Sequence, residues 1–301
     1  MSMPIRYCKN HEIDKTKWDK CISDASNGLV YAYSFCLDAL CTWDALVYND
    51  YEVVMPLPYR SKWGFKYVYQ LPFIQRLGVF GATTPQQVDA MYTAVTKHFR
   101  FIHYNTDQQP ANKDFKLVKH INYVINLHTS LHTIRANISK ECLKNIRKAT
   151  QRSCNLSTGV AAEQVIDLYR KAYDHLHPTV TNKDYDQFLL LTKKAIATGF
   201  AETFAIKDET GEIVFAAALL KDHRRLYYVI GAPTEKGRQL RATYFFINSI
   251  IEKYAGSNLL LDLEGSDIPN VAAFYQRFGP AAEEYYEVKY NNLPFPINLL
   301  K

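Results

Sequence analysis

The chain has 301 residues, of which 48% are hydrophobic and 14% aromatic, with 22 tyrosines and a formal net charge of +6. This composition can bury a large core, which excludes a disordered or collagen-like chain. The length suits one large domain or two ordinary ones. No apolar run is long enough to cross a membrane, so we expect no transmembrane segment.

We expect the cysteines to be reduced thiols. They form no Cys-x-x-Cys pair and no Cys–His cluster with zinc spacing, so we expect no metal site. Behind its first basic residue the N-terminal segment lacks the apolar stretch of a signal peptide. These features predict a cytoplasmic protein. The chain also has no Gly-x-Ser-x-Gly elbow and no Walker loop, so hydrolase and NTPase functions are not supported.

In chain order, the first half predicts a mixture of helices and strands. The expected helices, marked by capping residues or by a proline in the first turn, cover residues 13–25, 34–40 and 85–99. The expected strands cover residues 46–48, 52–58, 65–71, 101–104 and 117–127.

Residues 133–151 predict one long helix with two different faces. Its apolar face contains, at helical spacing, Ile134, Ile138, Cys142, Ile146 and Ala149. Its opposite face is basic and contains Lys140, Lys144, Arg147 and Lys148. Such a face could bind tRNA phosphates or another polyanion, although a solvated helix face is more common. We place a domain junction just before this helix, which divides the chain into 1–130 and 131–301.

The second half continues with helices and strands in alternation. The expected helices cover residues 161–175, 183–197 and 239–254. The expected strands cover residues 201–207, 213–221, 225–231 and 284–290. Between the last helix and the last strand lies a chemically distinctive stretch, Leu259 to Gly279.

This stretch predicts an apolar strand that ends in acids, followed by a short helix. Strand alternation places Asp262 and Glu264 on one face, and the sequence then turns at Gly265 and Ser266. Acids at the carboxyl end of a strand lie where open α/β sheets bind ligands. The helix after Ile268 ends in Phe-Tyr-x-x-Phe-Gly, which includes Tyr275.

The element order from 155 to 292 and the Tyr-x-x-x-Gly spacing of Tyr275 and Gly279 resemble the GNAT acyltransferase fold. The segment from Pro72 to Gly81 resembles the N-terminal domain of FemAB/FemX-like proteins, which are tandem GNAT domains. The resemblance is closest to an uncharacterised bacterial branch of that group. It implies an α/β (α+β) fold of two tandem GNAT-like domains, each a mixed, mostly antiparallel sheet flanked by helices.

The resemblance also implies a donor site. GNAT enzymes that use acyl-CoA carry Arg/Gln-x-x-Gly-x-Gly/Ala, whose backbone N–H groups bind the pyrophosphate. This chain has Lys236-Gly-Arg-Gln-Leu-Arg-Ala242 at that point. Leu240 replaces a small residue, and we expect its side chain to impede close approach. The residues expected to hold acyl-CoA are Gly237, Arg238, Arg241 and Ala242. FemX-like relatives take aminoacyl-tRNA instead.

Tyr275 is the expected general acid and Glu264 the group that binds or deprotonates an amine acceptor. The alternatives are a packed core tyrosine and a strand-end ion pair, and a structural role is favoured for Asp262. Ser266 is the expected cap of the next helix or a substrate contact. Further candidates for substrate contacts, in a strand-to-turn stretch that lines the inter-domain cleft of FemX-like proteins, are Gln75 and Arg76.

We therefore predict a transferase that moves an acyl group from acyl-CoA to a small-molecule or peptide amine by direct attack. One alternative is a FemX-like peptidyltransferase that uses aminoacyl-tRNA and acts on a cell-wall precursor. The other is a non-catalytic ligand-binding module. The sequence predicts no oligomeric state.

Overall fold

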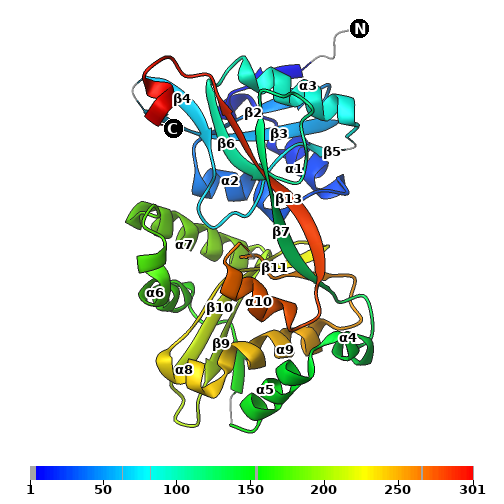
Figure 1. Ribbon diagram of the computed structural model, residues 1–301, viewed down its shortest axis with the longest axis vertical. Helices are drawn as coiled ribbons and strands as arrows, with labels where there is room; N and C mark the ends of the chain where they lie inside the picture. The colour runs from blue at the N-terminus through cyan, green and yellow to red at the C-terminus, as the bar shows by residue number, and fades with distance from the viewer. Residues whose placement is uncertain (1–4, 63, 82, 153–154, 266, 301) are drawn as a thin grey trace. The chain divides into compact units, whose positions relative to one another are not determined.

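The structure is a computed structural model that describes residues 5–62, 64–81, 83–152, 155–265 and 267–300. The chain forms two compact units (Figure 1). The first unit combines Met1–His120 with Glu284–Lys301, and the second contains Ile121–Glu283. No helix within the described ranges combines the length and the apolar character needed to cross a bilayer.

The first unit is built on a mixed sheet in the order β1-β2-β3-β4-β6-β13, with the short β5 against β3. Only the pair of β4 and β6 is parallel. The strands are β1 (Ile5–Cys8), β2 (Trp43–Tyr48), β3 (Val53–Lys62), β4 (Phe65–Tyr69), β5 (Phe80–Gly81), β6 (Phe101–Thr106) and β13 (Ala281–Asn291). The helices are α1 (Lys15–Asp24), α2 (Ser34–Leu40) and α3 (Pro85–Thr96), with 3-10 turns at Asn10–Glu12, Val30–Ala32 and Ile297–Leu300.

The second unit has a sheet in the order β7-β12-β11-β10-β9-β8, in which only β11 and β12 are parallel. The strands are β7 (Lys116–Asn126), β8 (Asn155–Thr158), β9 (Ala201–Lys207), β10 (Ile213–Lys221), β11 (Arg225–Pro233) and β12 (Leu260–Asp262). The helices are α4 (Leu131–Asn137), α5 (Lys140–Thr150), α6 (Ala162–Tyr173), α7 (Asn182–Ala197), α8 (Glu235–Leu240), α9 (Ala242–Tyr254) and α10 (Pro269–Gln276), with a 3-10 turn at Asp174–Leu176.

The division into units differs from the expected 1–130 and 131–301. Ile125 in β7 pairs with Leu261 in β12, so the second unit already begins near residue 121. At the other end, Val288 in β13 pairs with Tyr104 in β6, so the last strand returns to the first unit. Strand pairing between segments far apart in the chain decides this division, and hydrophobic periodicity does not reveal it.

The basic helix predicted over 133–151 is two helices. Ser130 caps α4 and Ser139 caps α5, and the extended backbone at Ile138 and Ser139 separates them. A serine that accepts from the amide three residues on starts a new helix in preference to continuing the old one. The predicted apolar face is nevertheless confirmed, since Ile134, Ile138, Cys142, Ile146 and Ala149 are all buried.

The predicted helix over 239–254 is likewise interrupted. Arg241 adopts a left-handed conformation with φ of 61°, which ends α8 and starts α9 in a new direction. Thr234 caps α8 by accepting a hydrogen bond from Gly237 N. The segment that follows β11 is therefore a short helix, a sharp turn and a long helix.

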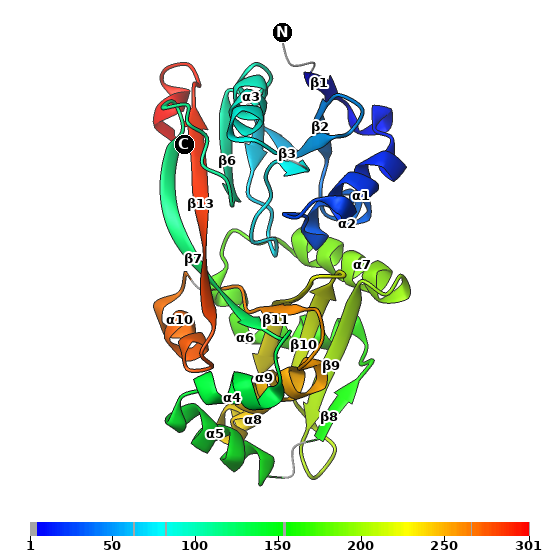
Figure 2. The same cartoon turned by 90° about the vertical axis from the view of Figure 1, so that its right-hand side faces the viewer.

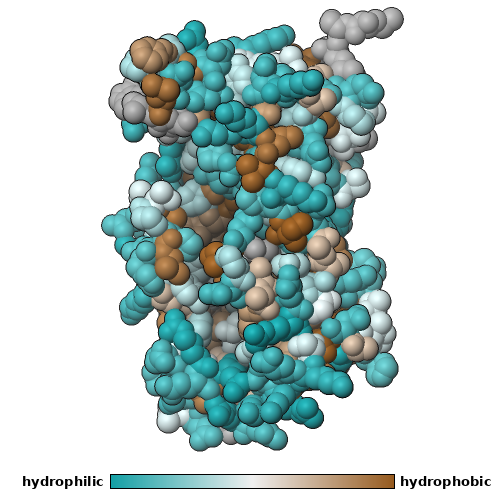
Figure 3. Space-filling model, in the orientation of Figure 1, coloured by the Kyte–Doolittle hydropathy of each residue, from teal (hydrophilic) through white to brown (hydrophobic). Residues whose placement is uncertain are grey.

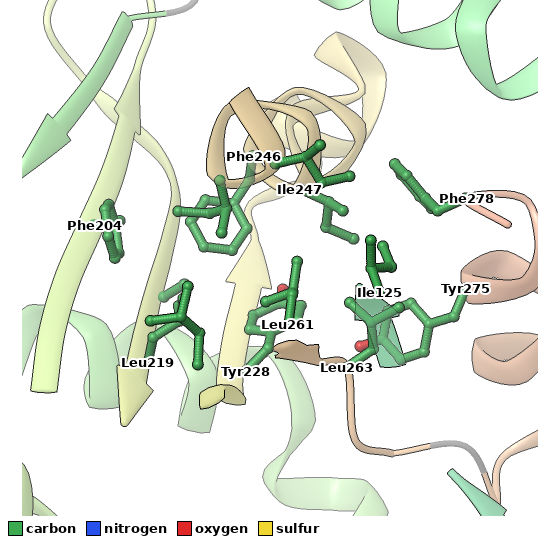
Figure 4. Packing of buried hydrophobic residues seen from close by; sticks show 14 of the residues in the cluster. Ile125, Phe204, Leu219, Tyr228, Phe246, Ile247, Leu261, Leu263, Tyr275 and Phe278 are labelled. Carbon is green, nitrogen blue, oxygen red and sulfur yellow. The ribbon is translucent and has the colours of Figure 1, made fainter. Parts of the chain in front are cut away.

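The core of the second unit lies between its sheet and α9 (Figures 1 and 2). Phe246 on α9 packs against Phe204, Phe215 and Tyr228, with ring centroids 5.7, 4.8 and 5.3 Å away. Leu261 and Leu263 join this cluster, as strand alternation predicts (Figure 4). The opposite face of the sheet is covered by α6 and α7 (Figure 2).

Candidate functional site

The site is built around the point where two parallel strands separate. β11 and β12 pair only from Arg225 with Leu260 to Tyr227 with Asp262. β12 then ends, whereas β11 continues to Pro233. Val229 is an extra residue in β11, because Ala218 pairs with Ile230 but Leu219 pairs with Tyr228. Such a bulge bends and twists its strand. Beyond Tyr227, the side of β11 that faced β12 no longer has that partner.

A pocket of about 340 Å³ lies beside this part of β11. Its volume is within the range of small-ligand sites. Its wall is strongly aromatic and includes Tyr173, Tyr228, Tyr244, Phe274 and Tyr275. Its lining also includes two cationic side chains, those of Arg238 and Arg241. The pocket therefore combines aromatic and cationic groups, all within the second unit.

The structure brings five of the predicted residues together at this pocket. Gly237, Arg238, Arg241 and Ala242 line it from the end of α8 and the start of α9, and Tyr275 lines it from α10. About 35 residues of chain separate the two groups, and the fold brings them to one cavity.

The start of α9 is suited to bind an anion. The N–H groups of Tyr244 and Phe245 bond back to Arg241 O, and the Arg241 side chain caps no amide. The amides of Ala242 and Thr243, at the first two helical positions, have no acceptor within the helix. Both residues line the pocket. Helix dipole and free N–H groups favour an anion at such a position.

Leu240 does not obstruct this helix end, contrary to the expectation from the sequence. Its side chain packs against the hydrophobic core, and it is not among the residues that line the pocket. The turn at Arg241 rotates the chain between the two helices and so directs Leu240 inward. Close packing requires a glycine at position 237, because a β-carbon there would lie 2.0 Å from the carbonyl oxygen of Val214.

Tyr275 is 9% exposed, and its ring packs against those of Tyr228 and Phe274. Its ring lies edge-on to Tyr228, with 6.4 Å between the centroids (Figure 4). Burial raises the pKa of the Tyr275 phenol, and the nearby Tyr173 and Glu264 raise it further. Tyr275 therefore remains protonated well beyond neutral pH, as a proton donor requires.

Glu264 is 7% exposed and, like Asp262, is not among the residues that line the pocket, but it lies close enough to influence the titration of Tyr275. Burial raises the pKa of the Glu264 carboxyl to about 8. The residue follows β12 in a left-handed conformation with φ of 47°, and Gly265 follows with φ of 58°. A non-glycine residue held in this region marks a strained turn, which is common at functional sites. A carboxyl group with a pKa near neutrality can both accept and release a proton.

Asp262 is held by the protein itself. Its Oδ1 accepts from Asn122 Nδ2 at 2.9 Å, and its Oδ2 pairs with Arg225 Nη1 at 3.0 Å. Arg225 also pairs with Glu283, with 2.8 Å between Nη1 and Oε2. Asp262 is 1% exposed and does not line the pocket. Of the two roles open to Asp262 in the sequence, substrate binding and a strand-end ion pair, the structure favours the ion pair.

The other predicted residues lie elsewhere. Gln75 and Arg76 belong to the first unit, where Arg76 Nη1 donates to Gln75 Oε1 and the Gln75 carbonyl accepts from Asn105. Their role in substrate binding stays a prediction. Ser266 lies outside the described residues.

The predicted polyanion-binding residues, Lys140, Lys144, Arg147 and Lys148, are all exposed on α5. The surface at the bottom of Figure 3, where α5 lies, is hydrophilic. This exposure fits both a polyanion-binding face and an ordinary solvated one.

Sequence analysis missed the aromatic wall. Tyr173, Tyr228 and Tyr244 come from the ends or interiors of three ordinary elements, α6, β11 and α9. The available signal was the tyrosine content, but 22 tyrosines spread over the chain do not indicate which ones converge. Convergence depends on where β11 and β12 separate.

No protein-family model matches the chain, and no curated protein matches its sequence. Solved structures match its fold. FemX superimposes with a TM-score of 0.69 at 11% identity, over 96% of this chain and 98% of FemX. The C-terminal domain of a putative lysylphosphatidylglycerol synthetase from Agrobacterium fabrum matches with a TM-score of 0.57 at 11% identity, over 97% of this chain and 95% of that domain.

A tandem GNAT protein from the clavulanic acid biosynthesis pathway matches with a TM-score of 0.52 at 9% identity, over 96% of this chain and 99% of that protein. These similarities extend over nearly the whole chain. They confirm the predicted fold, in which two GNAT-like units with mixed, mostly antiparallel sheets follow one another, and its likeness to FemX.

Proposed function

We propose that the second unit transfers an acyl or aminoacyl group from an activated donor, with acyl-CoA as the first candidate, to an amine. One observation carries the proposal: a single pocket joins a cationic helix start, a separated strand and a buried tyrosine beside a buried carboxyl group. The fold likeness to a tandem GNAT protein supports the same class of reaction.

The two cationic side chains that line the pocket would hold the anionic part of the donor. Arg238 and Arg241 supply guanidinium groups that can bind phosphate oxygens bidentately. The free amides of Ala242 and Thr243 add hydrogen bonds along the helix dipole. The group bound there would be the pyrophosphate of acyl-CoA or the phosphates at the end of an aminoacyl-tRNA, since both present phosphate oxygens.

The part of β11 beyond Tyr227, which is no longer paired with β12, would hold the extended part of the donor between its phosphates and its acyl group. Backbone groups that have lost a strand partner can pair with the amides of an extended ligand, as in peptide addition to a sheet edge. A backbone N–H in this stretch can also polarise the carbonyl that is attacked. Catalysis would come mainly from positioning donor and acceptor together, without a covalent enzyme intermediate.

Glu264 would accept a proton from the amine, and Tyr275 would donate one to the leaving group. The amine nitrogen attacks the thioester carbonyl and loses a proton to the Glu264 carboxylate, while the C–S bond breaks and Tyr275 protonates the departing sulfur. Transfer of the proton from Glu264 to the Tyr275 phenolate restores both groups. The pKa of about 8 at Glu264 provides a carboxylate fraction that grows as the pH rises.

Calorimetric titration with acetyl-CoA and longer acyl-CoAs tests the donor. Saturable binding at one site, lost in a variant that lacks Arg238 and Arg241, would support acyl-CoA. No heat of binding at millimolar CoA would remove CoA from the proposal and leave aminoacyl-tRNA as the donor to test.

The aminoacyl-tRNA alternative is favoured by one observation, the exposed basic face of α5. Clustered lysine and arginine side chains bind nucleic-acid phosphates in a salt-dependent manner. This donor would serve a FemX-like peptidyltransferase that acts on a cell-wall precursor. If neither donor binds, the pocket belongs to a non-catalytic ligand-binding module.

A further inference from the structure

We propose that Tyr228 determines how long an acyl group the pocket accepts, because its ring lies at the boundary between the cavity and the hydrophobic core. This inference rests on the proposed acyl transfer and adds a specificity-determining residue to it. Tyr228 lines the pocket and is also part of the hydrophobic core cluster. Ala242 and Tyr275 also belong to both, and Tyr228 is the residue of β11 at this boundary between the cavity and the packed interior of the second unit.

The position of the Tyr228 ring depends on Gly231. A β-carbon added to Gly231 would lie 2.3 Å from the Tyr228 hydroxyl oxygen and 2.5 Å from its Cε2 atom. Real β-carbons do not approach other heavy atoms so closely, so the ring lies directly over the α-carbon of Gly231. The bulge at Val229 separates the two residues on β11 and allows the ring to lie along its own strand.

Neighbouring rings hold Tyr228 from the other sides. Phe246 lies 5.3 Å away and Tyr275 lies 6.4 Å away, between ring centroids (Figure 4). A ring enclosed by Gly231, Phe246 and Tyr275 cannot move aside for a ligand without disturbing the core, because protein interiors are close-packed. Tyr228 is 6% exposed, in keeping with this enclosure.

Two consequences follow for the acyl group. In the native protein an acyl chain can extend only as far as the Tyr228 ring, so short acyl groups fit and long ones do not. Removal of the ring would join the cavity to the space beside Phe246. Each additional methylene that then becomes buried should tighten binding about fourfold.

The test measures binding of S-acyl-N-acetylcysteamine thioesters with two, six and ten acyl carbons, by NMR titration. These probes carry the acyl group, the thioester and an amide but no phosphate. The variants are Tyr228→Ala, Tyr228→Phe as the conservative control, Gly231→Ala, and the Gly231→Ala/Tyr228→Ala double variant. Tyr228→Ala removes a buried ring and could unfold the protein. In that case Gly231→Ala tests the proposal instead.

In the native protein and Tyr228→Phe, affinity should not rise beyond the short chain. In Tyr228→Ala, it should rise with length, by at least tenfold from two to six carbons. Gly231→Ala should weaken binding of every probe, because its methyl group pushes the ring into the cavity. The double variant should recover binding, since the clash requires both side chains.

The same chain-length preference in Tyr228→Ala as in the native protein would overturn the proposal. So would the absence of thioester binding in every folded variant. A length preference that follows Tyr228 in a protein without transferase activity would support this inference and count against the proposed function. The two ideas can therefore fail separately.

Discussion

The partly buried Arg225 and the buried Asp262 form an ion pair between β11 and β12, with 3.0 Å between Nη1 and Oδ2. The pair spans the short register that β11 and β12 share, since Arg225 lies at its first position, opposite Leu260, and Asp262 lies at its last, opposite Tyr227. It therefore fastens the two strands together immediately before they separate. Glu264, two residues further on, donates its amide to Asp262 Oδ1 at 3.2 Å, so the pair also helps to position the candidate base.

Asp262→Ala should lower the free energy of unfolding by about 1–3 kcal/mol, because it removes the acceptor of Asn122 Nδ2 and one of the two carboxylates that pair with Arg225. Urea denaturation followed by circular dichroism measures the change. Lys20→Ala removes an exposed pair with Asp24 and should have a much smaller effect, because solvent screens such pairs. An equal effect of the two substitutions would contradict the anchoring role of Asp262.

Stability should decline as the pH rises through the titration of Glu264. The pKa of this carboxyl rises from the ordinary 4.5 to about 8 on folding, so the folded chain keeps a proton that the unfolded chain releases. The contribution to stability is complete below pH 4.5 and is lost as the pH rises through about 8.

Glu264→Gln removes this titration. At pH 9 the variant should be more stable than the native protein by about 2–4 kcal/mol, relative to the difference between them at pH 5. Denaturation of both proteins at the two pH values measures the effect. Glu209→Gln, which makes the same change at an exposed position, is the matched control. A native protein with equal stability at both pH values would exclude the raised pKa.

Tyr275→Phe should reduce kcat by roughly 10²–10⁴-fold while KM changes little, because only the proton donor is removed. Steady-state kinetics with a purified acceptor measure both constants. Tyr92→Phe, which removes a buried phenol that bonds to Tyr104 in the first unit, is the control and should leave kcat unchanged. Unaltered kcat in Tyr275→Phe would leave the residue a packing role only.

Arg241→Gly should weaken donor binding about tenfold without lowering stability. Charge-assisted hydrogen bonds to the donor are lost, whereas the left-handed backbone at φ of 61° suits glycine better than arginine. Calorimetry and thermal unfolding measure the two effects. Asn49→Gly changes another left-handed residue, in the first unit, and should alter stability alone. Native donor affinity in Arg241→Gly would exclude this cation from the donor site.

Charge reversal on α5 separates the two candidate donors. Lys144→Glu/Arg147→Glu should leave kcat/KM with acyl-CoA within about twofold, because the residues lie on an exposed helix face and do not line the pocket. With aminoacyl-tRNA as donor the same change should lower kcat/KM by at least tenfold and reduce its dependence on salt. A large loss with acyl-CoA would mean that α5 contributes to the CoA site.

Local sequence patterns determined most of the elements and several of the site residues. The apolar faces of the helices, the strands of the second unit and the positions of Tyr275, Arg238 and Arg241 follow from periodicity and from a resemblance over short motifs. These signals act within a few residues, where side-chain spacing and backbone preference dominate.

The tertiary structure decided what those residues face. Leu240 packs against the core where the left-handed Arg241 separates α8 from α9, and Asp262 pairs with Arg225 because β11 and β12 bring the two residues together. The aromatic wall, the place of Tyr228 over Gly231 and the return of β13 to the first unit arise from contacts between distant segments. Sequence periodicity reports which side of an element is buried, but the neighbour it is buried against is set by strand register and packing.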